Sequence, residues 1–268
     1  MRPGNLAMII GAMLLFYRRA NVDGFTTLGL CAIGVMVALA AGGNMINDYF
    51  DIREDAVNKP RLALVGRVIK RRVVLVSHWI WMLVALFAAV VISFGVGASW
   101  PLIWTLVLGI CLTIYSPWAK RRFLIGNLLV AGSVAQLPMW ALLVSQGGAD
   151  WAQPLAPWFA VTAAGFALTL LREVVKDVQD APGDAQMGFD TLPIRWGNQR
   201  TWTSLRWGYT AVGAGLTALS IAQGQWAAAI YLLPLALAYR AVWRSDARAL
   251  SAWTKVVLGC GLLAFGWS

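Results

Sequence analysis

Long apolar runs alternate with short polar connections along almost the whole chain. Each run covers about 16–25 residues between charged, glycine or proline positions, which is the length of an α-helix that crosses a bilayer. The runs are too long, and alternate too weakly, for the strands of a membrane β-barrel. We therefore expect an all-α, polytopic membrane protein, a bundle of about nine transmembrane helices over residues 5–20, 25–50, 73–96, 100–116, 123–145, 154–180, 201–222, 226–243 and 252–267.

The composition supports this class. Of the 268 residues, 59% are hydrophobic and only 13% are charged, whereas roughly a quarter of the residues in soluble proteins are charged. No low-complexity segment or long linker interrupts the chain, so we expect a single domain over residues 1–268. The net charge of +10 could indicate nucleic acid, but the basic residues lie between apolar runs. Anionic membrane lipid and phosphate-bearing substrates are therefore better partners than nucleic acid.

The distribution of basic residues predicts an orientation in the membrane. The connections expected on the same side as the N-terminus are those near 51–72, 117–122, 181–200 and 244–251. The opposite connections contain no Lys or Arg, and only Arg18 and Arg19 of the 22 basic residues lie on that side. The positive-inside rule places the basic side in the cytoplasm. We expect an integral protein of the cell (inner) membrane.

Two copies of one acidic pattern lie on the basic side. Residues 44–55 read N-x-x-x-D-x-x-D-x-x-x-D, and residues 173–184 read E-x-x-x-D-x-x-D-x-x-x-D. These two acidic stretches contain eight of the twelve acidic residues: Asp48, Asp51, Glu54, Asp55, Glu173, Asp177, Asp180 and Asp184. Such a concentration, in a chain with few acidic residues elsewhere, indicates a function.

The spacing predicts that each set lies on one face of a helix, because positions i, i+4, i+7 and i+11 point the same way. Stacked carboxylates repel each other, and a bound cation would compensate. Spaced oxygen ligands suit a hard ion such as Mg²⁺. Two copies on the same side of one bundle can face each other across a central cavity that opens to the cytoplasm.

Three interpretations compete for the acidic stretches. As structural helix-end residues, their side chains would be dispersed and paired with nearby Lys and Arg. As the pathway of a transporter, they would lie near the middle of the bilayer, where intramembrane acids mark relays; here they lie at the cytoplasmic ends of helices. A metal–diphosphate site needs two acidic faces, divalent cations and nearby basic donors, and the sequence supplies this combination.

Basic residues that can bind a diphosphate flank both acidic stretches. Lys binds phosphate oxygens as a point charge and Arg as a planar fork. The candidates are Lys59, Arg61, Arg67, Lys120, Arg172 and Lys176. A residue that only sets the topology is the alternative for each of them. Arg172 and Lys176 stand out, because a cation within a membrane helix needs a partner.

This combination predicts the transfer of an allylic group. Metal ions and basic residues stabilise a diphosphate leaving group, so that its C–O bond can ionise to a carbocation that an electron-rich acceptor attacks. An apolar chamber within a helix bundle shelters such a cation. Tyr115 is a candidate for contacting the diphosphate or the cation, with a tyrosine at the membrane interface as the alternative. Asn44 and Asn127 are further candidates for contacts to substrate.

At these residues the chain resembles the UbiA superfamily of intramembrane prenyltransferases. The resemblance covers nearly the whole length and includes residues 44–55, Asn58-Lys59-Pro60, residues 115–121, Gly126-Asn127 and residues 173–184. It implies a nine-helix bundle, Mg²⁺-dependent transfer of a prenyl group and an active-site mouth on the cytoplasmic side. The metal-binding roles that it implies fall on Asp48, Asp51, Asp55, Asp177, Asp180 and Asp184. The diphosphate-binding roles that it implies fall on Asn44, Lys120 and Tyr115.

Within the superfamily, residues 172–180, Gly183-Asp184 and Thr191-Leu192-Pro193 resemble the digeranylgeranylglyceryl phosphate synthase branch. That branch transfers geranylgeranyl to the hydroxyl of geranylgeranylglyceryl phosphate and forms an ether lipid. One position departs from the superfamily pattern. Leu62 stands where an Arg usually follows the Asn-Lys-Pro motif, which leaves Arg61 or Arg67 as the source of that phosphate contact.

We therefore expect a Mg²⁺-dependent enzyme that transfers a geranylgeranyl group from an isoprenoid diphosphate to a lipophilic acceptor, geranylgeranylglyceryl phosphate. The alternative among enzymes is an aromatic acceptor, as in quinone biosynthesis, which needs no second phosphate site. The alternative of another class is an ion or proton-coupled transporter. The only histidine, His78, begins an apolar run, so we expect it at the membrane interface rather than in catalysis.

Overall fold

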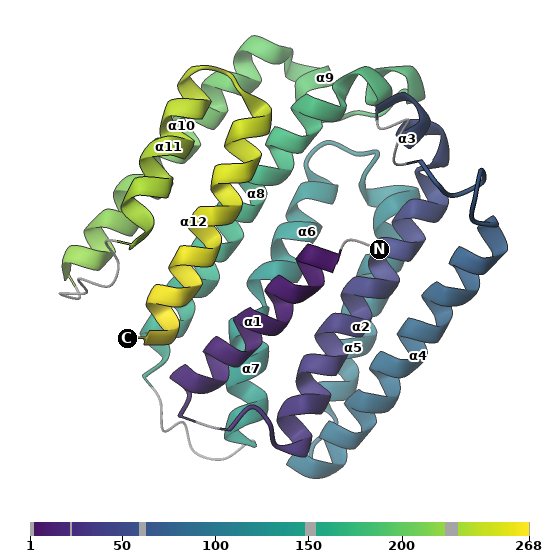
Figure 1. Ribbon diagram of the computed structural model, residues 1–268, viewed down its shortest axis with the longest axis vertical. Helices are drawn as coiled ribbons and strands as arrows, with labels where there is room; N and C mark the ends of the chain where they lie inside the picture. The colour runs from purple at the N-terminus through teal and green to yellow at the C-terminus, as the bar shows by residue number, and fades with distance from the viewer. Residues whose placement is uncertain (1–2, 22, 59–62, 148–153, 223–229, 268) are drawn as a thin grey trace. The chain divides into compact units, whose positions relative to one another are not determined.

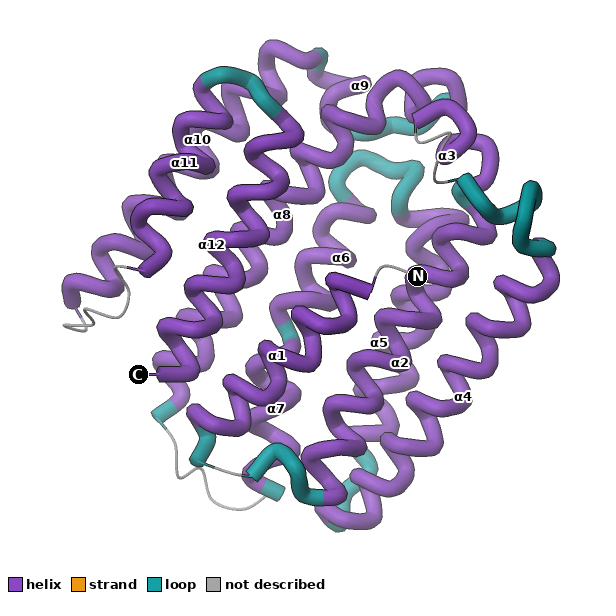
Figure 2. Tube along the Cα trace, in the orientation of Figure 1, coloured by secondary structure: helices purple, strands orange, loops and turns teal. Residues whose placement is uncertain are grey.

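The computed structural model describes residues 3–21, 23–58, 63–147, 154–222 and 230–267. Within these ranges every extended regular element is a helix, as Figure 2 shows, and the only β feature is an isolated bridge between Val65 and Ile69. The helices are α1 (Pro3–Arg19), α2 (Thr27–Phe50), α3 (Ile52–Asn58), α4 (Arg71–Val96), α5 (Trp100–Ile114), the π-helix η1 (Tyr115–Ala119), α6 (Ile125–Ala135), α7 (Leu137–Gln146), α8 (Leu155–Met187), α9 (Leu192–Trp196), α10 (Asn198–Ala222), α11 (Leu232–Trp243) and α12 (Ala247–Trp267).

Each of the nine predicted apolar runs coincides with helix over most of its described residues (Figure 1). Among the described residues, six helical spans are long and apolar enough to cross a membrane: Thr27–Phe50, Arg71–Val96, Trp100–Ala119, Ile125–Gln146, Leu155–Met187 and Ala247–Gly266. The helix α11 is also apolar but shorter. The predicted all-α class is therefore confirmed. Short helices that the apolar pattern did not predict, α3 and α9, lie in the polar connections.

The run predicted as one helix over 123–145 is two helices. The helix α6 ends at Ala135 and α7 begins at Leu137, with Pro138 in its first turn. Proline lacks a backbone N–H, and its ring disfavours helical backbone at the residue before it. Pro138 therefore favours the start of a new helix over the continuation of α6, and the prediction of an unbroken helix is wrong here.

The helix predicted over 154–180 continues about two turns further, to Met187. It ends at Gly188, which adopts a φ of 68°. The Phe189 N–H donates to the Asp184 carbonyl at 2.9 Å, and the Gly188 N–H donates to the Ala185 carbonyl at 3.3 Å. This pair of bonds is a Schellman motif, which favours glycine at the left-handed position. The whole second acidic stretch is consequently helical.

The chain divides into two compact units. Unit 1 comprises residues 1–121 and 137–154, and unit 2 comprises residues 122–136 and 155–268. The first acidic stretch belongs to unit 1 and the second to unit 2, so each unit is described by itself below. The organisation of residues 1–268 as a single domain stays a prediction.

In unit 1, α2 packs against α4 and α5, and α1 packs against α2 and α7. The helices α2 and α4 approach closely at Gly42, where an added Cβ would lie 2.3 Å from the Met82 Cε. At this crossing the fully buried His78 donates from Nδ1 to the Gly42 carbonyl oxygen at 2.9 Å. His78 therefore connects two helices in the interior of unit 1. Its expected position at the depth of the membrane interface stays a prediction.

In unit 2, α8 packs against α6, α9, α10 and α12. The apolar core of unit 2, to which α11 also contributes, includes Val174, Val175, Leu192, Trp202, Leu205, Tyr209, Ala238, Ala241, Val242 and Leu250. The Gln179 side chain donates from Nε2 to the Ala247 carbonyl oxygen at 2.7 Å, at the point where α12 begins. This contact connects the acidic end of α8 to the start of α12.

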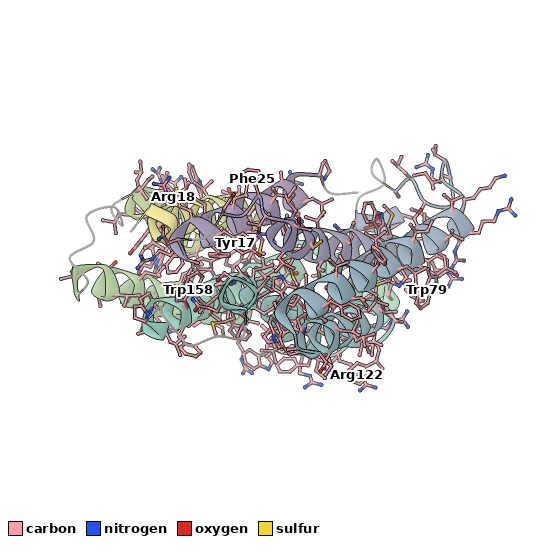
Figure 3. All side chains as sticks on the ribbon, turned by 90° about the horizontal axis from the view of Figure 1, so that it is seen from below. Tyr17, Arg18, Phe25, Trp79, Arg122 and Trp158 are labelled. Carbon is pink, nitrogen blue, oxygen red and sulfur yellow. The ribbon has the colours of Figure 1, made fainter. Side chains whose placement is uncertain are left out.

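The outer surface of α4 carries large apolar side chains. Trp79, Phe87 and Phe94 are 55%, 73% and 84% exposed, and Figure 3 shows Trp79 at the edge of the molecule. By contrast, Tyr17 of α1, also labelled in Figure 3, is only 1% exposed. Soluble proteins rarely expose so much contiguous apolar surface. Side chains of this kind are suited to contact with lipid acyl chains.

Candidate active site

The first acidic stretch is not on one helix. The helix α2 ends at Phe50, Asp51 lies at the junction with φ −86° and ψ 10°, and α3 begins at Ile52. The Asp51 N–H donates to the Asn47 carbonyl (2.9 Å) at the end of α2, and the Asp55 N–H donates to the Asp51 carbonyl (2.7 Å) at the start of α3. The chain therefore passes from one helix to the next at Asp51. The prediction that Asn44, Asp48, Asp51 and Asp55 share one straight helix face is wrong.

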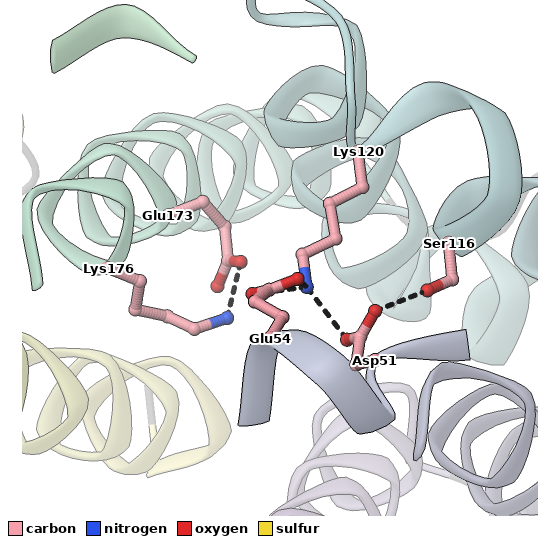
Figure 4. A network of polar contacts seen from close by, with 6 residues as sticks. All are labelled: Asp51, Glu54, Ser116, Lys120, Glu173 and Lys176. Atoms are coloured by element: carbon pink, nitrogen blue, oxygen red, sulfur yellow. Dashed lines mark hydrogen bonds and ion pairs between the residues drawn. The ribbon is translucent and has the colours of Figure 1, made fainter. Parts of the chain in front are cut away.

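At this junction Asp51 contacts residues that follow α5, in and just after η1. Ser116 donates from Oγ to the Asp51 Oδ1 at 2.9 Å, and Lys120 donates from Nζ to Oδ2 at 2.7 Å (Figure 4). Both oxygens of Asp51 thus accept hydrogen bonds from residues 65 and 69 positions further along the chain. These contacts hold the Asp51 side chain in place, whereas the sequence spacing had predicted that a helix face would do so.

Glu54 of α3 completes this arrangement. The Lys120 Nζ lies 2.8 Å from its Oε1 and 2.7 Å from its Oε2 (Figure 4). Glu54 is 3% exposed and Asp51 is 9% exposed, so both carboxylates are buried around one ammonium. We call Asp51, Glu54, Ser116 and Lys120 the ammonium cluster.

The electrostatics of the ammonium cluster favour a charged lysine. Burial is the largest single influence on the pKa of Lys120 and would lower it, because burial disfavours the ammonium. The charges of Asp51 and Glu54, with the hydrogen bonds that they accept, act in the opposite direction and together raise the pKa above its usual value. Lys120 therefore stays protonated at neutral pH, despite its burial.

A local irregularity of the backbone presents Ser116 and Lys120 to Asp51. Residues Tyr115–Ala119 form one turn of π-helix, which the Lys120 N–H closes by bonding to the Tyr115 carbonyl at 2.8 Å. Pro117 within this turn has no N–H, and its ring would clash with the carbonyl four residues earlier in an α-helix. The wider π turn relieves this clash, and such turns occur frequently at functional sites.

The other residues predicted in the first half of the site are dispersed over several elements. Asn44 and Asp48 lie on the last turns of α2, Asp55 lies on α3, and Tyr115 begins η1. Arg67 is an exposed residue of the connection before α4. Lys59 and Arg61 lie outside the described residues. Leu62, the position that differs from the superfamily pattern, also lies outside them.

The second acidic stretch lies on one helix, as its spacing predicts. Glu173, Asp177, Asp180 and Asp184 are all part of α8. Glu173 is 4% exposed and pairs with two cations of its own helix. Arg172 donates from Nη1 at 3.1 Å. Lys176 donates from Nζ at 2.6 Å, as Figure 4 shows. Glu173 is thus the anionic partner that both Arg172 and Lys176 require as cations within a membrane helix.

Asp177 accepts a hydrogen bond from another helix. Asn127 of α6 donates from Nδ2 to the Asp177 Oδ2 at 2.8 Å. Asn127 was expected to contact substrate, but here it contacts a predicted metal ligand. The helices α6 and α8 pack side by side along this region. Further along α8, Asp184 is 2% exposed and Asp180 is half-buried.

Three residues of these groups were not assigned a role from the sequence. Glu54 lies outside the i, i+4, i+7, i+11 positions, so the spacing gave no reason to select it. Ser116 lies within residues 115–121, which carry part of the family resemblance, but no role was assigned to it. Glu173 could have been selected, because it occupies the first polar position of the second pattern and is flanked by Arg172 and Lys176.

Both groups have a donor chemistry that fits a hard divalent cation, which prefers carboxylate and other oxygen ligands. In unit 1 a cation, the ammonium of Lys120, already lies between two buried carboxylates. The Asn47 Oδ1, one turn before Asp51, is buried and receives no hydrogen bond from the described residues. Within those same residues, no three His, Cys, Asp or Glu side chains are gathered closely enough to hold a metal ion. Water or substrate phosphate would complete the coordination, as is usual for Mg²⁺.

The fold and these side chains define an α-helical membrane protein whose acidic helix ends can hold cations. Comparison with known proteins identifies the family. The chain belongs to the UbiA prenyltransferase family, whose model matches residues 6–268, and is therefore an integral membrane prenyltransferase. The predicted family and enzyme class are confirmed.

Individual relatives agree with this assignment. A digeranylgeranylglyceryl phosphate synthase of Methanopyrus kandleri is 34% identical over 291 residues, which cover 98% of this chain and 95% of that relative. A solved structure of a digeranylgeranylglyceryl phosphate synthase has a TM-score of 0.69 at 22% identity, over 98% of this chain and 92% of its own. A UbiA homologue from Archaeoglobus fulgidus, bound to DMAPP and Mg²⁺, has a TM-score of 0.62 at 15% identity, over 97% and 96% of the two chains. The solved structures share the fold.

Proposed function

We propose that this prenyltransferase transfers a geranylgeranyl group from geranylgeranyl diphosphate to the hydroxyl of geranylgeranylglyceryl phosphate, and that the reaction requires Mg²⁺. The observation that carries the proposal is the ammonium cluster, in which buried carboxylates hold a cation beside the connection that carries Lys120. The choice of acceptor is supported by the name of the Methanopyrus kandleri relative. The need for Mg²⁺ is supported by the donor chemistry and by the Archaeoglobus fulgidus homologue bound to DMAPP and Mg²⁺.

The residues that would hold the metal ions are the aspartates of both stretches: Asp48, Asp51, Asp55, Asp177, Asp180 and Asp184. Bound Mg²⁺ supplies positive charge that stabilises the diphosphate as a leaving group. Asn127 orients Asp177 through the bond to Oδ2, and Ser116 orients Asp51 through the bond to Oδ1. These two donors fix carboxylate directions before any ligand enters.

The basic residues bind the diphosphate and stabilise the charge that develops on it as the C–O bond breaks. We assign this role to Lys120, Arg172 and Lys176, with Lys59, Arg61 or Arg67 as further donors. Asn44 and Tyr115 lie on elements that adjoin Asp51 and complete the contacts to the diphosphate. The allylic carbocation that remains is attacked by the acceptor hydroxyl, whose proton is lost as the ether bond forms.

We further propose that the mouth of the active site faces the cytoplasm and that the protein lies in the cell (inner) membrane. The asymmetry of Lys and Arg between the two sets of connections supports this orientation. Cysteine labelling from outside intact cells would contradict it if a cysteine introduced at Arg67 reacted as quickly as one introduced at Gly97.

The experiment that tests the function uses purified full-length protein, Mg²⁺ and radiolabelled geranylgeranyl diphosphate. Geranylgeranylglyceryl phosphate and 4-hydroxybenzoate are supplied as acceptors in parallel reactions. We expect a Mg²⁺-dependent product with the glyceryl phosphate. Product with 4-hydroxybenzoate alone would establish an aromatic acceptor instead. If neither product nor diphosphate release occurs with folded protein, the proposal is wrong, and ion flux across vesicles becomes the next measurement.

A further inference from the structure

Arg206 of α10 has a guanidinium group that the protein itself uses only in part. A guanidinium has five N–H donors. Within the described residues one of them is used, because the Arg206 Nη2 donates to the Ser245 Oγ at 3.3 Å. The Arg206 Nε is buried and has no hydrogen-bond partner there. Most donors of this cation therefore have no acceptor in the protein, and an anion from outside would supply one.

The guanidinium is nevertheless held in one place. Its Cζ lies 5.1 Å from the centroid of the Trp243 ring, at the end of α11. One turn away on each helix, the Thr210 Oγ1 donates to the Tyr239 hydroxyl at 3.4 Å, and the Tyr239 and Trp243 rings lie 6.1 Å apart. Both contacts join α10 to α11, which pack side by side (Figure 1). Stacking occupies a face of the guanidinium, and the N–H donors in its plane can still bind an anion.

The charges around Arg206 favour an anion. Residues 198–268 include six basic residues and one acidic residue, Asp246. The Asp246 Oδ1 accepts from the Ala249 N–H at 3.0 Å, so this carboxylate caps the start of α12. Arg244, the residue after α11, is exposed. Among the described residues, no carboxylate forms an ion pair with Arg206 or Arg244. An anion bound here would therefore compensate charge that the protein leaves unpaired.

An exposed face of α11 leads away from this cation. Leu232, Ala236, Tyr239 and Trp243 are spaced by i, i+4, i+7 and i+11, so they share one face of the helix. All four are exposed, Leu232 at 44% and Trp243 at 54%. The 12 residues of α11 extend over about 18 Å, close to the roughly 15 Å of hydrocarbon in one leaflet of a bilayer. A ligand with an anionic head and a long apolar chain fits this arrangement better than a free anion.

The charged end of this face lies at the level where lipid headgroups are expected. Ser245, which accepts from Arg206, lies two residues before the candidate membrane span Ala247–Gly266. A span of this kind begins where the hydrocarbon meets the headgroups. Tyrosine and tryptophan are enriched at this interface, as Tyr239 and Trp243 would be here. The position of the cation therefore favours a headgroup phosphate as its anion.

We propose that Arg206, Arg244, Tyr239 and Trp243, together with the exposed face of α11, form a binding site for one anionic phospholipid. The headgroup phosphate accepts hydrogen bonds from the Arg206 guanidinium, and Arg244 adds a second positive charge. One acyl chain of the lipid lies along α11. The inference is independent of the proposed function, because none of these residues is assigned to prenyl transfer.

The test is native mass spectrometry of the delipidated full-length protein in detergent. Dioleoyl phosphatidylglycerol, dioleoyl phosphatidylcholine and glycerol 3-phosphate are titrated separately. The two lipids have the same chains, and glycerol 3-phosphate carries the anion without chains. We expect phosphatidylglycerol to bind about tenfold more tightly than phosphatidylcholine, which corresponds to about 1.4 kcal/mol, and also more tightly than glycerol 3-phosphate. Equal affinities for the two lipids would overturn the proposal, as would glycerol 3-phosphate binding as tightly as phosphatidylglycerol.

Two arginines of α10 provide a matched pair of variants. Arg206→Gln should lower the affinity for phosphatidylglycerol about tenfold and leave that for phosphatidylcholine unchanged, which also shows that the variant folds. Arg200→Gln removes the same charge from an exposed position on another face of the same helix and should leave both affinities unchanged. Equal losses in the two variants would mean that net charge, rather than this site, attracts the lipid, and the proposal would be wrong.

Trp243→Leu keeps an apolar side chain but removes the ring that holds the guanidinium. It should lower the affinity for phosphatidylglycerol about threefold, as expected for the loss of a cation–π contact at an exposed site. We expect the unaltered protein and this variant to have the same oligomeric mass in the same spectra. A dimer that dissociates in Trp243→Leu would show that a second copy of the chain, rather than lipid, covers α11, and would overturn the proposal.

Discussion

The two acidic stretches have nearly the same sequence pattern but are built differently. In unit 2 the pattern lies along the single helix α8, and its buried Glu173 is neutralised by Arg172 and Lys176 of the same helix. In unit 1 the pattern bends at Asp51, and the cation that neutralises it, Lys120, comes from 69 residues further along the chain. The second group is organised mainly by local spacing, and the first by tertiary contacts.

This difference separates two ways of holding acidic side chains ready for a ligand. A helix face sets the spacing of the acidic side chains, but each carboxylate still needs a separate hydrogen-bond donor. For Asp177 that donor is Asn127. The ammonium cluster instead gathers two carboxylates around one cation, and the bend brings Glu54 into a position that the helical pattern would not give it. The first group should therefore depend more strongly on its internal cation than the second.

The largest expected effect tests whether the two groups nevertheless serve the same reaction. Asp48→Ala and Asp177→Ala should each lower kcat/KM for prenyl transfer by at least about 100-fold, because each removes a charged group that supports the leaving diphosphate. Turnover of radiolabelled geranylgeranyl diphosphate measures the effect, and size-exclusion chromatography shows that the variants fold. Asp190→Asn is the control, since Asp190 pairs with Arg195 at the surface.

One combination of results for these two variants would show that the acidic stretches have different roles. Near-normal turnover of Asp48→Ala alongside an inactive Asp177→Ala would restrict the metal site to unit 2. The first acidic stretch would then serve to position Lys120 rather than to bind metal.

The next effect concerns stability and contrasts the two internal cations. Lys120→Met should lower the free energy of unfolding by about 2 kcal/mol, somewhat less than the 3–5 kcal/mol for a fully buried pair that loses one partner. Lys176→Met should cost less, about 1 kcal/mol, because Glu173 keeps Arg172 and the Lys176 side chain is 29% exposed. Thermal unfolding in detergent with EDTA measures both. Equal losses would mean that the origin of the cation does not matter.

The sequence predicts more of unit 2 than of unit 1, for a physical reason. Helical periodicity is a local property, so the face shared by Glu173, Asp177, Asp180 and Asp184 follows directly from their spacing. Asp51 is bound by Ser116 and Lys120 from distant parts of the chain, and no local pattern indicates that these side chains reach it. The same holds for His78, whose partner is the Gly42 carbonyl of another helix.

The helices themselves follow from the apolar runs, because a run long enough to cross a bilayer forms a helix to satisfy its backbone. Their interruptions depend on single residues. Pro138 begins α7, and Gly188 ends α8 beyond the predicted boundary. A hydrophobicity pattern does not predict these helix boundaries, because the residues around Pro138 remain apolar and Gly188 lies at a polar helix end.

The next, smaller effect concerns how Asn127 orients Asp177 in the second acidic stretch. Asn127→Leu removes the only side-chain hydrogen bond described for Asp177 and should raise the Mg²⁺ concentration needed for half-maximal activity about tenfold, as expected for a residue that orients a metal ligand. Asn127→Gln, which retains the amide, should recover part of this loss. If Asn127→Leu instead raised the KM for the diphosphate at saturating Mg²⁺, Asn127 would contact substrate, as the sequence first indicated.

The smallest expected effect concerns the corresponding donor of the first group. Ser116→Ala removes the hydroxyl that holds the Asp51 Oδ1 and should destabilise the protein by about 1 kcal/mol, the usual contribution of one hydrogen bond. Because Lys120 still holds the Oδ2, the Mg²⁺ requirement should change less than in Asn127→Leu. Parallel Mg²⁺ titrations of the two variants give this ranking. A larger shift for Ser116→Ala would mean that Ser116, rather than Lys120, fixes the direction of Asp51.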